Sequence, residues 1–225
     1  MEQPFDRSIQ AIGQAAFEKL QNARVILFGA GGVGGWCAEV LIRTGLMHLT
    51  IVDFDVVNPS NINRQVVATR TNIGQPKVEE LRKRLLLLNP DADITALGIR
   101  YGYATDTQFD FNQYDYIIDA IDSVADKVLL LNRATESKAT VFSSMGAGRK
   151  LDTTAIRVSE FRKVEGCPLA RALRTKMKQE NIFPKKKFLC VWSPELSAEK
   201  GTIAPVVGVF GMTLADLVIK DILNA

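Results

Sequence analysis

The stretch RVILFGAGGVGGWCAEVLIRTG, residues 24–45, joins an apolar run to an amphipathic segment through a glycine-rich turn. The run Val25–Phe28 predicts a buried strand, and the segment Gly34–Thr44 predicts a helix. Glycines let phosphate oxygens approach the backbone, and a helix N-terminus offers N–H groups that no carbonyl occupies. The turn therefore predicts a nucleotide-binding pattern, G-x-G-x-x-G, in which we expect four glycines to hold phosphates: Gly29, Gly31, Gly32 and Gly34.

The glycine turn alone does not decide which nucleotide is bound. Asp53 ends the next predicted strand, 19 residues after Gly34, where a carboxylate could accept hydrogen bonds from ribose hydroxyls. NAD and ATP both carry an adenosine and phosphates, so these residues leave both open. A glycine turn without any ligand is the structural alternative.

Apolar runs alternate with helix-like segments over the first 160 residues or so, which predicts a parallel sheet covered by helices. The other predicted strands are Leu49–Val52, Ile94–Leu97, Tyr116–Ile118, Val141–Ser143 and Ile156–Val158. The other predicted helices are Pro76–Leu88, with Pro76 at its first position, Val124–Lys138 and Pro168–Gln179. The fold class is therefore α/β: a Rossmann-like, mostly parallel sheet with helices on both faces, plus a basic C-terminal portion.

We expect one ATP-binding domain over residues 1–225. Within it we expect an N-terminal helical arm (1–22), a nucleotide-binding core (23–160), a basic insert facing the substrate (161–200) and a C-terminal helix that docks on the core (201–225). The stretch FLCVWSPELSAEKG, residues 188–201, has no clear period and receives no assignment.

Composition narrows the class of protein. No apolar run reaches the ~18 residues that a membrane span needs, and the N-terminus has no signal-peptide pattern. Cys37, Cys167 and Cys190 are isolated, without a C-x-x-C pair, so neither a zinc cage nor a disulfide framework is expected. We expect a cytoplasmic protein.

Basic residues concentrate in one window. Residues 155–190 hold ten Lys and Arg against three Glu, a local excess of seven positive charges in a chain whose net charge is +3. Such an excess can form an anion-binding face, and a solvated helix with a lysine-rich loop is the plainer alternative.

Polar residues after the second predicted strand favour ATP over NAD. A triphosphate needs cations beside the helix N-terminus: Arg64 can hold phosphate oxygens bidentately, and Lys77 can add a point charge. Surface ion pairs with Glu79 or Glu80 are the alternative for either one. The set predicted to surround the nucleotide is Asp55, Asn61, Arg64, Gln65 and Lys77.

Asp122 follows the strand predicted over Tyr116–Ile118, at an edge where ligands bind in open α/β sheets. A carboxylate there is suited to Mg²⁺, which prefers carboxylate and phosphate oxygens. Met145–Gly148 follows the next strand. This segment either shapes the same pocket or makes a plain tight turn.

The motifs GAGGVGG, DFD, NINRQ, GQPK and DAIDS occur in order within residues 5–145. Together they resemble the family of ubiquitin-activating and molybdopterin/thiamin-pathway adenylating enzymes (ThiF/MoeB/HesA-like). The resemblance implies binding of ATP and Mg²⁺ and transfer of AMP to a carboxylate.

By this resemblance Asp53 holds the ribose, Arg64 and Lys77 hold phosphates, and Asp122 holds the magnesium. Arg7 matches an N-terminal arginine that reaches the γ-phosphate from the other subunit of a homodimer. Arg7, Arg64, Lys77 and Asp122 are thus the implied catalytic residues. No pattern identifies a monovalent cation site.

The second half, with SSMGAGRKLDTTAIRVSEFRK, CPLARALRTKMK and PVVGVFGMTLADLVIKDIL, resembles the tRNA threonylcarbamoyladenosine dehydratase branch of this family. That branch implies adenylation of the threonyl carboxylate and closure to a cyclic hydantoin, with tRNA phosphates on the basic window. Cys167 departs from the acidic residue common at this position in relatives. Docking of a sulfur-transfer protein is left open.

Three alternatives remain. The chain could adenylate the C-terminus of a ubiquitin-like or sulfur-carrier protein, but such enzymes usually carry a catalytic cysteine and often zinc pairs. Isolated cysteines are more often small buried hydrophobes. An NAD-binding redox protein and a catalytically silent docking module complete the set.

Overall fold

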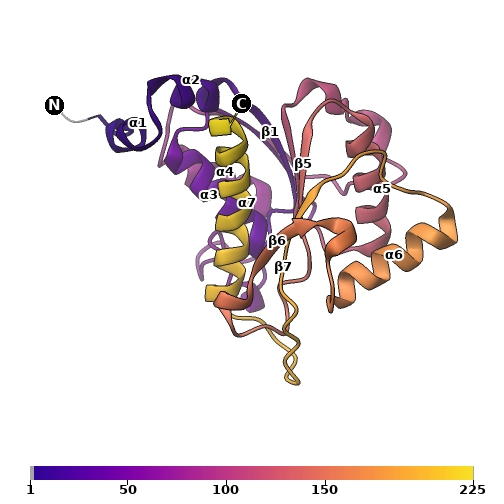
Figure 1. Cartoon of the computed structure of the whole chain (residues 1–225). Coiled ribbons are helices and arrows are strands. Elements are labelled where there is room, and N and C mark those ends of the chain that lie inside the picture. The colour runs from indigo at the N-terminus through magenta and orange to yellow at the C-terminus, as the bar shows by residue number, and fades with distance from the viewer. Residues whose placement is uncertain (1–2, 225) are drawn as a thin grey trace.

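A seven-stranded sheet forms the middle layer of the computed structural model, which describes residues 3–224 (Figure 1). The order across the sheet is β3-β2-β1-β4-β5-β7-β6, and every neighbouring pair is parallel except β6 with β7. The predicted Rossmann-like, mostly parallel sheet is confirmed. The strands are β1 (Arg24–Phe28), β2 (His48–Val52), β3 (Asp93–Leu97), β4 (Tyr116–Asp119), β5 (Thr140–Ser144), β6 (Arg157–Glu160) and β7 (Leu189–Trp192).

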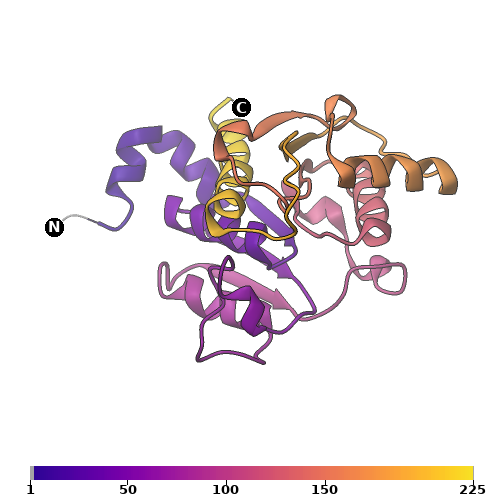
Figure 2. The same cartoon turned by 90° about the horizontal axis from the view of Figure 1, so that it is seen from below.

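Helices cover both faces of the sheet. The view of Figure 1 and the perpendicular view of Figure 2 place α3, α4 and α7 on one side and α5 and α6 on the other. The helices are α1 (Asp6–Ile12), α2 (Gln14–Asn22), α3 (Gly32–Thr44), α4 (Lys77–Leu86), α5 (Val124–Glu136), α6 (Pro168–Glu180) and α7 (Ala204–Asn224).

Two hydrophobic cores follow from the alternation of side chains along the strands. Val25 and Leu27 of β1 belong to the core under α2, α3, α4 and α7. Ile26 and Phe28 belong to the core under α5 and α6. Because successive side chains of a strand point to opposite faces, a strand buried on both sides reads as a continuous apolar run. This is why Val25–Phe28 is apolar throughout.

Helices α3 and α7 pack closely against each other. A Cβ at Gly211 would overlap the carbonyl oxygen of Val33 and lie 2.7 Å from Cβ of Trp36. Small residues at such a crossing let the two backbones approach, which brings the C-terminal helix against the glycine turn. The predicted helix over the end of the chain is present, and it packs on α3.

One sequence expectation differs from the structure, and one stretch that received no assignment contains a strand. Pro76 was expected at the first position of its helix, but it precedes α4 in an extended conformation, with φ −58° and ψ 128°, and pairs with Val56 in an antiparallel bridge. The unassigned stretch 188–201 contains β7, which lies inside the sheet between β5 and β6. Residues 161–200, expected as an insert, therefore contribute a strand to the core.

We expect Gly211→Ala and Gly208→Ala to have opposite effects, although both glycines are buried in α7. The Gly211 variant must push α3 away, at a cost of about 1–3 kcal/mol in the free energy of unfolding. A Cβ at Gly208 meets Trp36 only at 3.8 Å. Alanine there should stabilise the helix by up to about 1 kcal/mol.

Denaturant unfolding of both variants beside the parent chain checks this pair. Equal stabilities for the two variants would contradict the packing described for α3 and α7.

Candidate nucleotide-binding site

A cleft of about 480 Å³ opens at the carboxyl ends of β1, β2 and β4. Phe28, the last residue of β1, lies beside Val52 of β2 and Asp119 of β4, so the loops after these strands meet there. In the sheet, β2 lies on one side of β1 and β4 lies on the other. The order of the strands reverses between β1 and β4, and open α/β sheets bind ligands at such a switch point. The sequence-predicted residues that line the cleft are Gly29, Gly31, Gly32, Asp53, Asp55, Asn61, Arg64, Gln65, Lys77 and Asp122.

The glycines of the turn serve different purposes. Gly29 has φ +96°, and a Cβ there would lie 2.7 Å from the carbonyl oxygen of Ala120. At Gly31 the nearest atom to a Cβ would be Nε2 of Gln65 at 3.9 Å, so this position is open toward the cleft. Gly31 is also the N-cap of α3, whose first N–H groups are available to an anion.

Gly34 was expected among the nucleotide-binding residues, but it does not line the cleft. A Cβ at Gly34 would overlap the carbonyl oxygen of Gly29. Its lack of a side chain instead allows the first turn of α3 to close against β1.

Asp53 connects the glycine turn to β2. Its Oδ2 accepts a hydrogen bond from the N–H of Ala30 at 2.7 Å, and its Oδ1 accepts one from the N–H of Asp55 at 2.8 Å. Burial raises the pKa of the Asp53 carboxyl, while these backbone donors and the charge of Lys77 oppose that shift. Each carboxylate oxygen keeps a lone pair for a further donor, such as a ribose hydroxyl.

Lys77 is 5% exposed, and its Nζ lies 2.7 Å from Oδ2 of Asp55. Its own N–H donates to the Asp55 carbonyl, which fixes the start of α4 beside β2. The alternative in which Lys77 pairs with Glu79 or Glu80 is not what the structure contains, since Glu80 pairs with Lys83. The ammonium is therefore held at the wall of the cleft with one acidic partner.

A short 3-10 turn, η1 (Pro59–Asn61), positions Asn61, Arg64 and Gln65. Asn58 and Asn61 cap each other reciprocally, and the carbonyl of Asn61 accepts from the N–H groups of Arg64 and Gln65. Nη1 of Arg64 donates to the carbonyl of Ser60 and to Asn63, at 2.8 and 2.9 Å. The guanidinium thus has remaining donors that an anion in the cleft could engage.

Asp122 lies on the opposite wall, exposed, beside the segment Met145–Gly148 that follows β5. Within residues 3–224, no group of three or more His, Cys, Asp or Glu side chains is placed to hold a metal ion. Mg²⁺ at nucleotide sites is commonly held by one or two carboxylates together with substrate phosphates. Asp122 is an exposed carboxylate in a cleft that Arg64 and Lys77 also line, which fits that arrangement. The Met145–Gly148 segment lines the cleft, as one of its two interpretations expected.

Two buried polar atoms in the wall lack a hydrogen-bond partner within residues 3–224. They are Oε1 of Gln65 and Oγ1 of Thr202. Buried polar groups are rarely left unpaired in folded proteins. The cleft therefore offers a buried acceptor and a buried hydroxyl to a polar ligand, and the Gln65 side chain lies beside the open side of Gly31.

Sequence reasoning missed the buried ion pair that supports this edge of the sheet. Nζ of Lys127 lies 2.7 Å from Oδ2 of Asp119, and both side chains are fully buried. Ser143 donates to the same carboxylate, and Lys127 also donates to the carbonyl of Ile121. The pair thereby fixes the turn that leads from β4 to Asp122. Nothing in the local pattern distinguishes Lys127 from an exposed lysine of α5.

Phe54 and Arg100 were also missed, and both line the cleft mouth. The Arg100 guanidinium lies 5.4 Å from the Phe54 ring and pairs with Asp126 at 2.8 Å. Arg100 comes three residues after β3, and position after a parallel strand is the signal that could have indicated it.

All three cysteines are buried. Burial raises the pKa of the Cys37 and Cys190 thiols, which disfavours the reactive thiolate. None of the three lines the cleft.

Arg7 is exposed on α1, outside the set of residues that line the cleft. The helix after it, α2, leads into the first residue of β1, at the opposite end of that strand from the glycine turn. The chain therefore does not bring Arg7 to its own cleft.

The basic window 155–190 divides into two sets. Five of its cations are engaged within the chain: Arg157 over Trp192, Arg174 with two carbonyls, Lys176 with Glu180, Lys186 with two carbonyls and Lys187 near Glu160. Five others are exposed and make no ion pair within residues 3–224: Arg162, Lys163, Arg171, Lys178 and Lys185. Five of the ten cations in the window are thus available to an outside partner.

Residues 5–225 match the model of the ThiF family. The chain belongs to the ThiF family. This confirms the resemblance drawn from the five motifs and extends it over nearly the whole sequence.

Within the ThiF family the chain is similar to several named relatives. It is 37% identical over 191 residues to a tRNA threonylcarbamoyladenosine dehydratase of Bacillus subtilis, covering 85% of this chain and 74% of that one. It is 30% identical over 203 residues to the molybdopterin-synthase adenylyltransferase of Escherichia coli, covering 90% and 74%.

Among solved structures, it matches the E. coli tRNA N6-threonylcarbamoyladenosine dehydratase TcdA in complex with ATP. The TM-score is 0.92 at 30% identity, over 98% of this chain and 94% of that one. No helix within residues 3–224 is long and apolar enough to cross a membrane.

We expect Lys127→Met to destabilise the protein by about 3–5 kcal/mol, because it leaves the buried Asp119 carboxylate without its counter-ion. The double variant Asp119→Asn/Lys127→Met should recover part of that loss. Without Lys127 the pKa of Asp119 rises further above its value in the unfolded chain, so the variant loses stability as the pH rises through that higher pKa.

Urea unfolding at pH 5 and pH 8 measures both effects. A Lys127→Met variant as stable as the parent at pH 8 would show that the pair does not support the fold.

Proposed function

We propose that this chain is an ATP-dependent enzyme that cyclises threonylcarbamoyladenosine in tRNA to its hydantoin form. One observation carries the proposal: a single cleft is lined by the glycine turn, by Asp53, by the two cations Arg64 and Lys77, and by Asp122. The similarity to relatives named tRNA threonylcarbamoyladenosine dehydratase over 85% of the chain supports the choice of substrate.

The chemistry begins with a carboxylate, which is a poor acyl donor because oxide is a poor leaving group. In the first step a threonyl carboxylate oxygen attacks the α-phosphorus of ATP, and pyrophosphate leaves with the electrons of the broken P–O bond. In the second step the carbamoyl nitrogen attacks the acyl carbon, loses its proton and expels AMP. The ring closes within one small molecule, so no protein thiol is required, which agrees with the burial of all three cysteines.

In this proposal the chain mainly positions charge. The N–H groups at the start of α3 and the side chains of Arg64 and Lys77 neutralise phosphate oxygens as negative charge shifts toward pyrophosphate. Asp53 holds the ribose, and Asn61, which caps η1, fixes the loop that carries Arg64 and Gln65. Asp122 would hold Mg²⁺, and that ion would supply further neutralisation of phosphate charge when bound.

We also propose that the enzyme acts as a homodimer in which Arg7 reaches the cleft of the second copy. The position of Arg7, on an exposed helix outside its own cleft, supports this arrangement. The exposed cations of window 155–190 would contact tRNA phosphates, an interaction that weakens with salt. A cytoplasmic location follows from this substrate.

The second candidate is adenylation of a carrier-protein C-terminus. The similarity to molybdopterin-synthase adenylyltransferase favours it, because the same cleft could activate a different carboxylate. The exposed basic set on α6 and its flanking loops favours the tRNA substrate instead.

Incubation with ATP, Mg²⁺ and tRNA bearing threonylcarbamoyladenosine tests the proposal. We expect nucleoside mass analysis to show loss of one water from the modified nucleoside, with AMP and pyrophosphate released in equal amounts. Absence of hydantoin and of tRNA-dependent pyrophosphate would contradict the proposal. Stabilisation against heat by NAD but not by ATP-Mg²⁺ would contradict the adenylating activity as a whole.

We expect Arg64→Ala to lower kcat/KM roughly 100-fold, since it removes a donor to phosphate oxygens. The free energy of unfolding should change by less than about 0.5 kcal/mol, because the hydrogen bonds of Arg64 lie at the surface. Arg70→Ala is the matched control: an exposed arginine six residues away that does not line the cleft.

Steady-state kinetics of the two variants decides the role of Arg64. Near-normal turnover of Arg64→Ala at saturating ATP would show that Arg64 does not act on the phosphates during the reaction.

A further inference from the structure

A second cavity, of about 500 Å³, lies at the C-terminal end of α6, within the basic window. Its walls come from the end of β6, from η5 (Phe161–Lys163), from α6 and from the loop that leads into β7. The residues lining it are Glu160, Phe161, Arg162, Arg174, Met177, Lys178, Phe183, Pro184, Lys185, Lys186, Lys187 and Phe188. The proposed adenylation and ring closure use none of these side chains, and the proposed tRNA contact uses only the exposed cations Arg162, Lys178 and Lys185.

The inner wall of this cavity is aromatic. The rings of Phe161 and Phe188 are stacked, with centroids 5.2 Å apart and an interplanar angle of 17°, and both are buried. The Arg174 guanidinium lies 5.2 Å from the Phe161 ring. Phe183 completes the lining and is 47% exposed, so an apolar face remains open to solvent.

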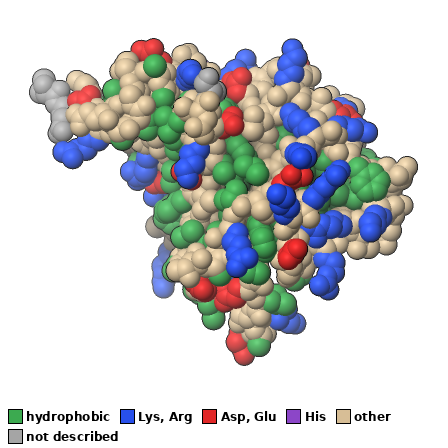
Figure 3. Space-filling model, viewed as in Figure 1, with side chains coloured by type: hydrophobic (Ala, Val, Ile, Leu, Met, Phe, Trp, Pro, Cys, Tyr) green, Lys and Arg blue, Asp and Glu red, His purple; other side chains and the backbone are tan. Residues whose placement is uncertain are grey.

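The rim is cationic. Six of the lining residues are Lys or Arg, and Glu160 is the one acid among them. Arg162, Lys178 and Lys185 are exposed and make no ion pair within residues 3–224. In Figure 3 blue side chains gather over the α6 side of the molecule, around a green hydrophobic area at its edge. An exposed aromatic ring beside three cations without ion pairs fits a ligand that is flat, apolar and attached to negative charge.

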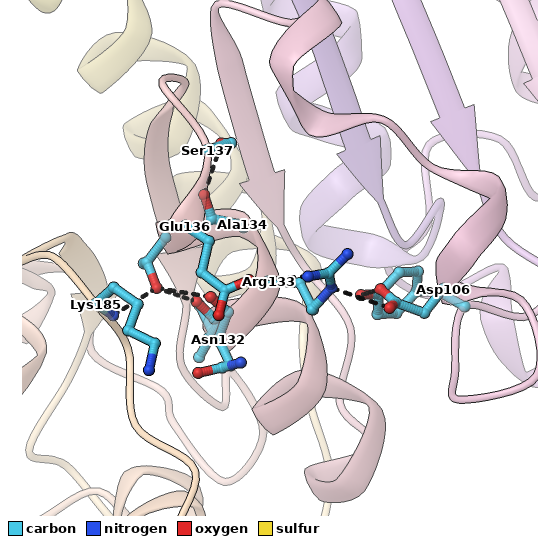
Figure 4. Close-up of polar contacts among 10 residues, drawn as sticks. Asp106, Asn132, Arg133, Ala134, Glu136, Ser137 and Lys185 are labelled. Carbon is cyan, nitrogen blue, oxygen red and sulfur yellow. Dashed lines mark hydrogen bonds and ion pairs between the residues drawn. The ribbon is translucent and has the colours of Figure 1, made fainter.

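The loop over residues 183–188 is anchored on α5, so the cavity is formed without a ligand. The N–H of Lys185 donates to Oγ1 of Thr135 at 2.9 Å, and Nζ of Lys186 donates to the carbonyls of Ser137 and Ala139. Figure 4 shows Lys185 against the last turn of α5, where Arg133 also pairs with Asp106 at 3.0 Å. A wall held in this way loses little entropy on binding.

Helix α6 connects this cavity to the nucleotide cleft. Leu169 at the start of α6 lines the cleft, and Met177 and Lys178 near its end line the cavity. At about 1.5 Å per residue the two positions lie ~12 Å apart along the helix. Stacked nucleotides advance about 3.4 Å each, so a strand could cross this span in roughly three to four nucleotides, and in fewer where it is unstacked.

We propose that the cavity is a subsite for an unstacked base of the tRNA loop that carries the reacting adenosine. The base stacks on the exposed ring of Phe183, and its flanking phosphates meet Arg162, Lys178 and Lys185. Bases of single-stranded loops are commonly bound on aromatic rings and arginine planes. This inference rests on the proposed function, since it assigns a second contact to the same substrate. An acidic peptide is the other ligand that such a cavity could hold, but it would leave the exposed Phe183 ring without a stacking partner.

Phe183→Ala and Phe183→Leu test the stacking. We expect Phe183→Ala to raise KM for tRNA and the Kd of a matching stem-loop RNA about tenfold, with kcat unchanged. Phe183→Leu keeps an apolar side chain without a ring and should lose most of the same affinity. An abasic nucleotide at one loop position should reproduce the loss, and Phe183→Ala should then add nothing.

Lys178→Ala tests the phosphate contact independently of the aromatic wall. We expect it to reduce the slope of log K against log salt by about one, whereas Phe183→Ala leaves that slope unchanged. Two matched controls lie outside the cavity. Leu87→Ala removes an apolar side chain that is 86% exposed, and Lys19→Ala removes an exposed cation of α2. Both variants should bind RNA as the parent does.

The outcomes separate this inference from the proposed function. If the parent chain forms no hydantoin, the proposed function fails. If it forms hydantoin while both Phe183 variants keep the parent's KM and Kd for RNA, the base subsite alone is overturned. The base subsite would also be overturned if the Phe183 variants lost binding to an acidic peptide while they bound RNA as the parent does.

Discussion

The structure depends on the close packing of the glycine turn against the backbone that follows the strands on either side of it. Gly29 lies against the carbonyl of Ala120 after β4, and Gly34 lies against the carbonyl of Gly29, with no room for a Cβ at either position. The carboxylate of Asp53 binds the turn from the β2 side through the N–H of Ala30. These contacts aim the N-terminus of α3 into the cleft, and the close packing of α7 on α3 secures it.

Two ion pairs at the cleft and beneath it differ in how far they are buried. Lys77 shares its charge with the half-exposed Asp55, so it can neutralise an anion without being buried unpaired. The Asp119–Lys127 pair is fully buried and makes no contact with the open cleft, and it fixes the turn that presents Asp122. The first pair stays accessible to a ligand, while the second is a structural support whose removal would leave a buried charge.

Most of the sheet and its covering helices follow from apolar periodicity, because the strands buried on both faces are apolar throughout. The prediction failed where tertiary contacts override local pattern. Leu189–Trp192 reads as ambiguous because a four-residue strand has no measurable period, yet pairing with β5 and β6 makes it part of the sheet. Pro76 reads as a helix start, but its neighbours are held in an extended bridge to residues 55–57.

The sequence by itself determined the strand–turn–helix, the family and ten residues that meet in one cleft, because spacing after parallel strands fixes which loops converge. Only the tertiary structure decided that Gly34 packs against the carbonyl of Gly29 and that Lys127 is buried. It also decided that half of the basic window is engaged within the chain and that Phe161, Phe183 and Phe188 form a cavity. The reason is physical: burial and pairing depend on partners distant in sequence, such as Asp119 for Lys127, and no local pattern records them.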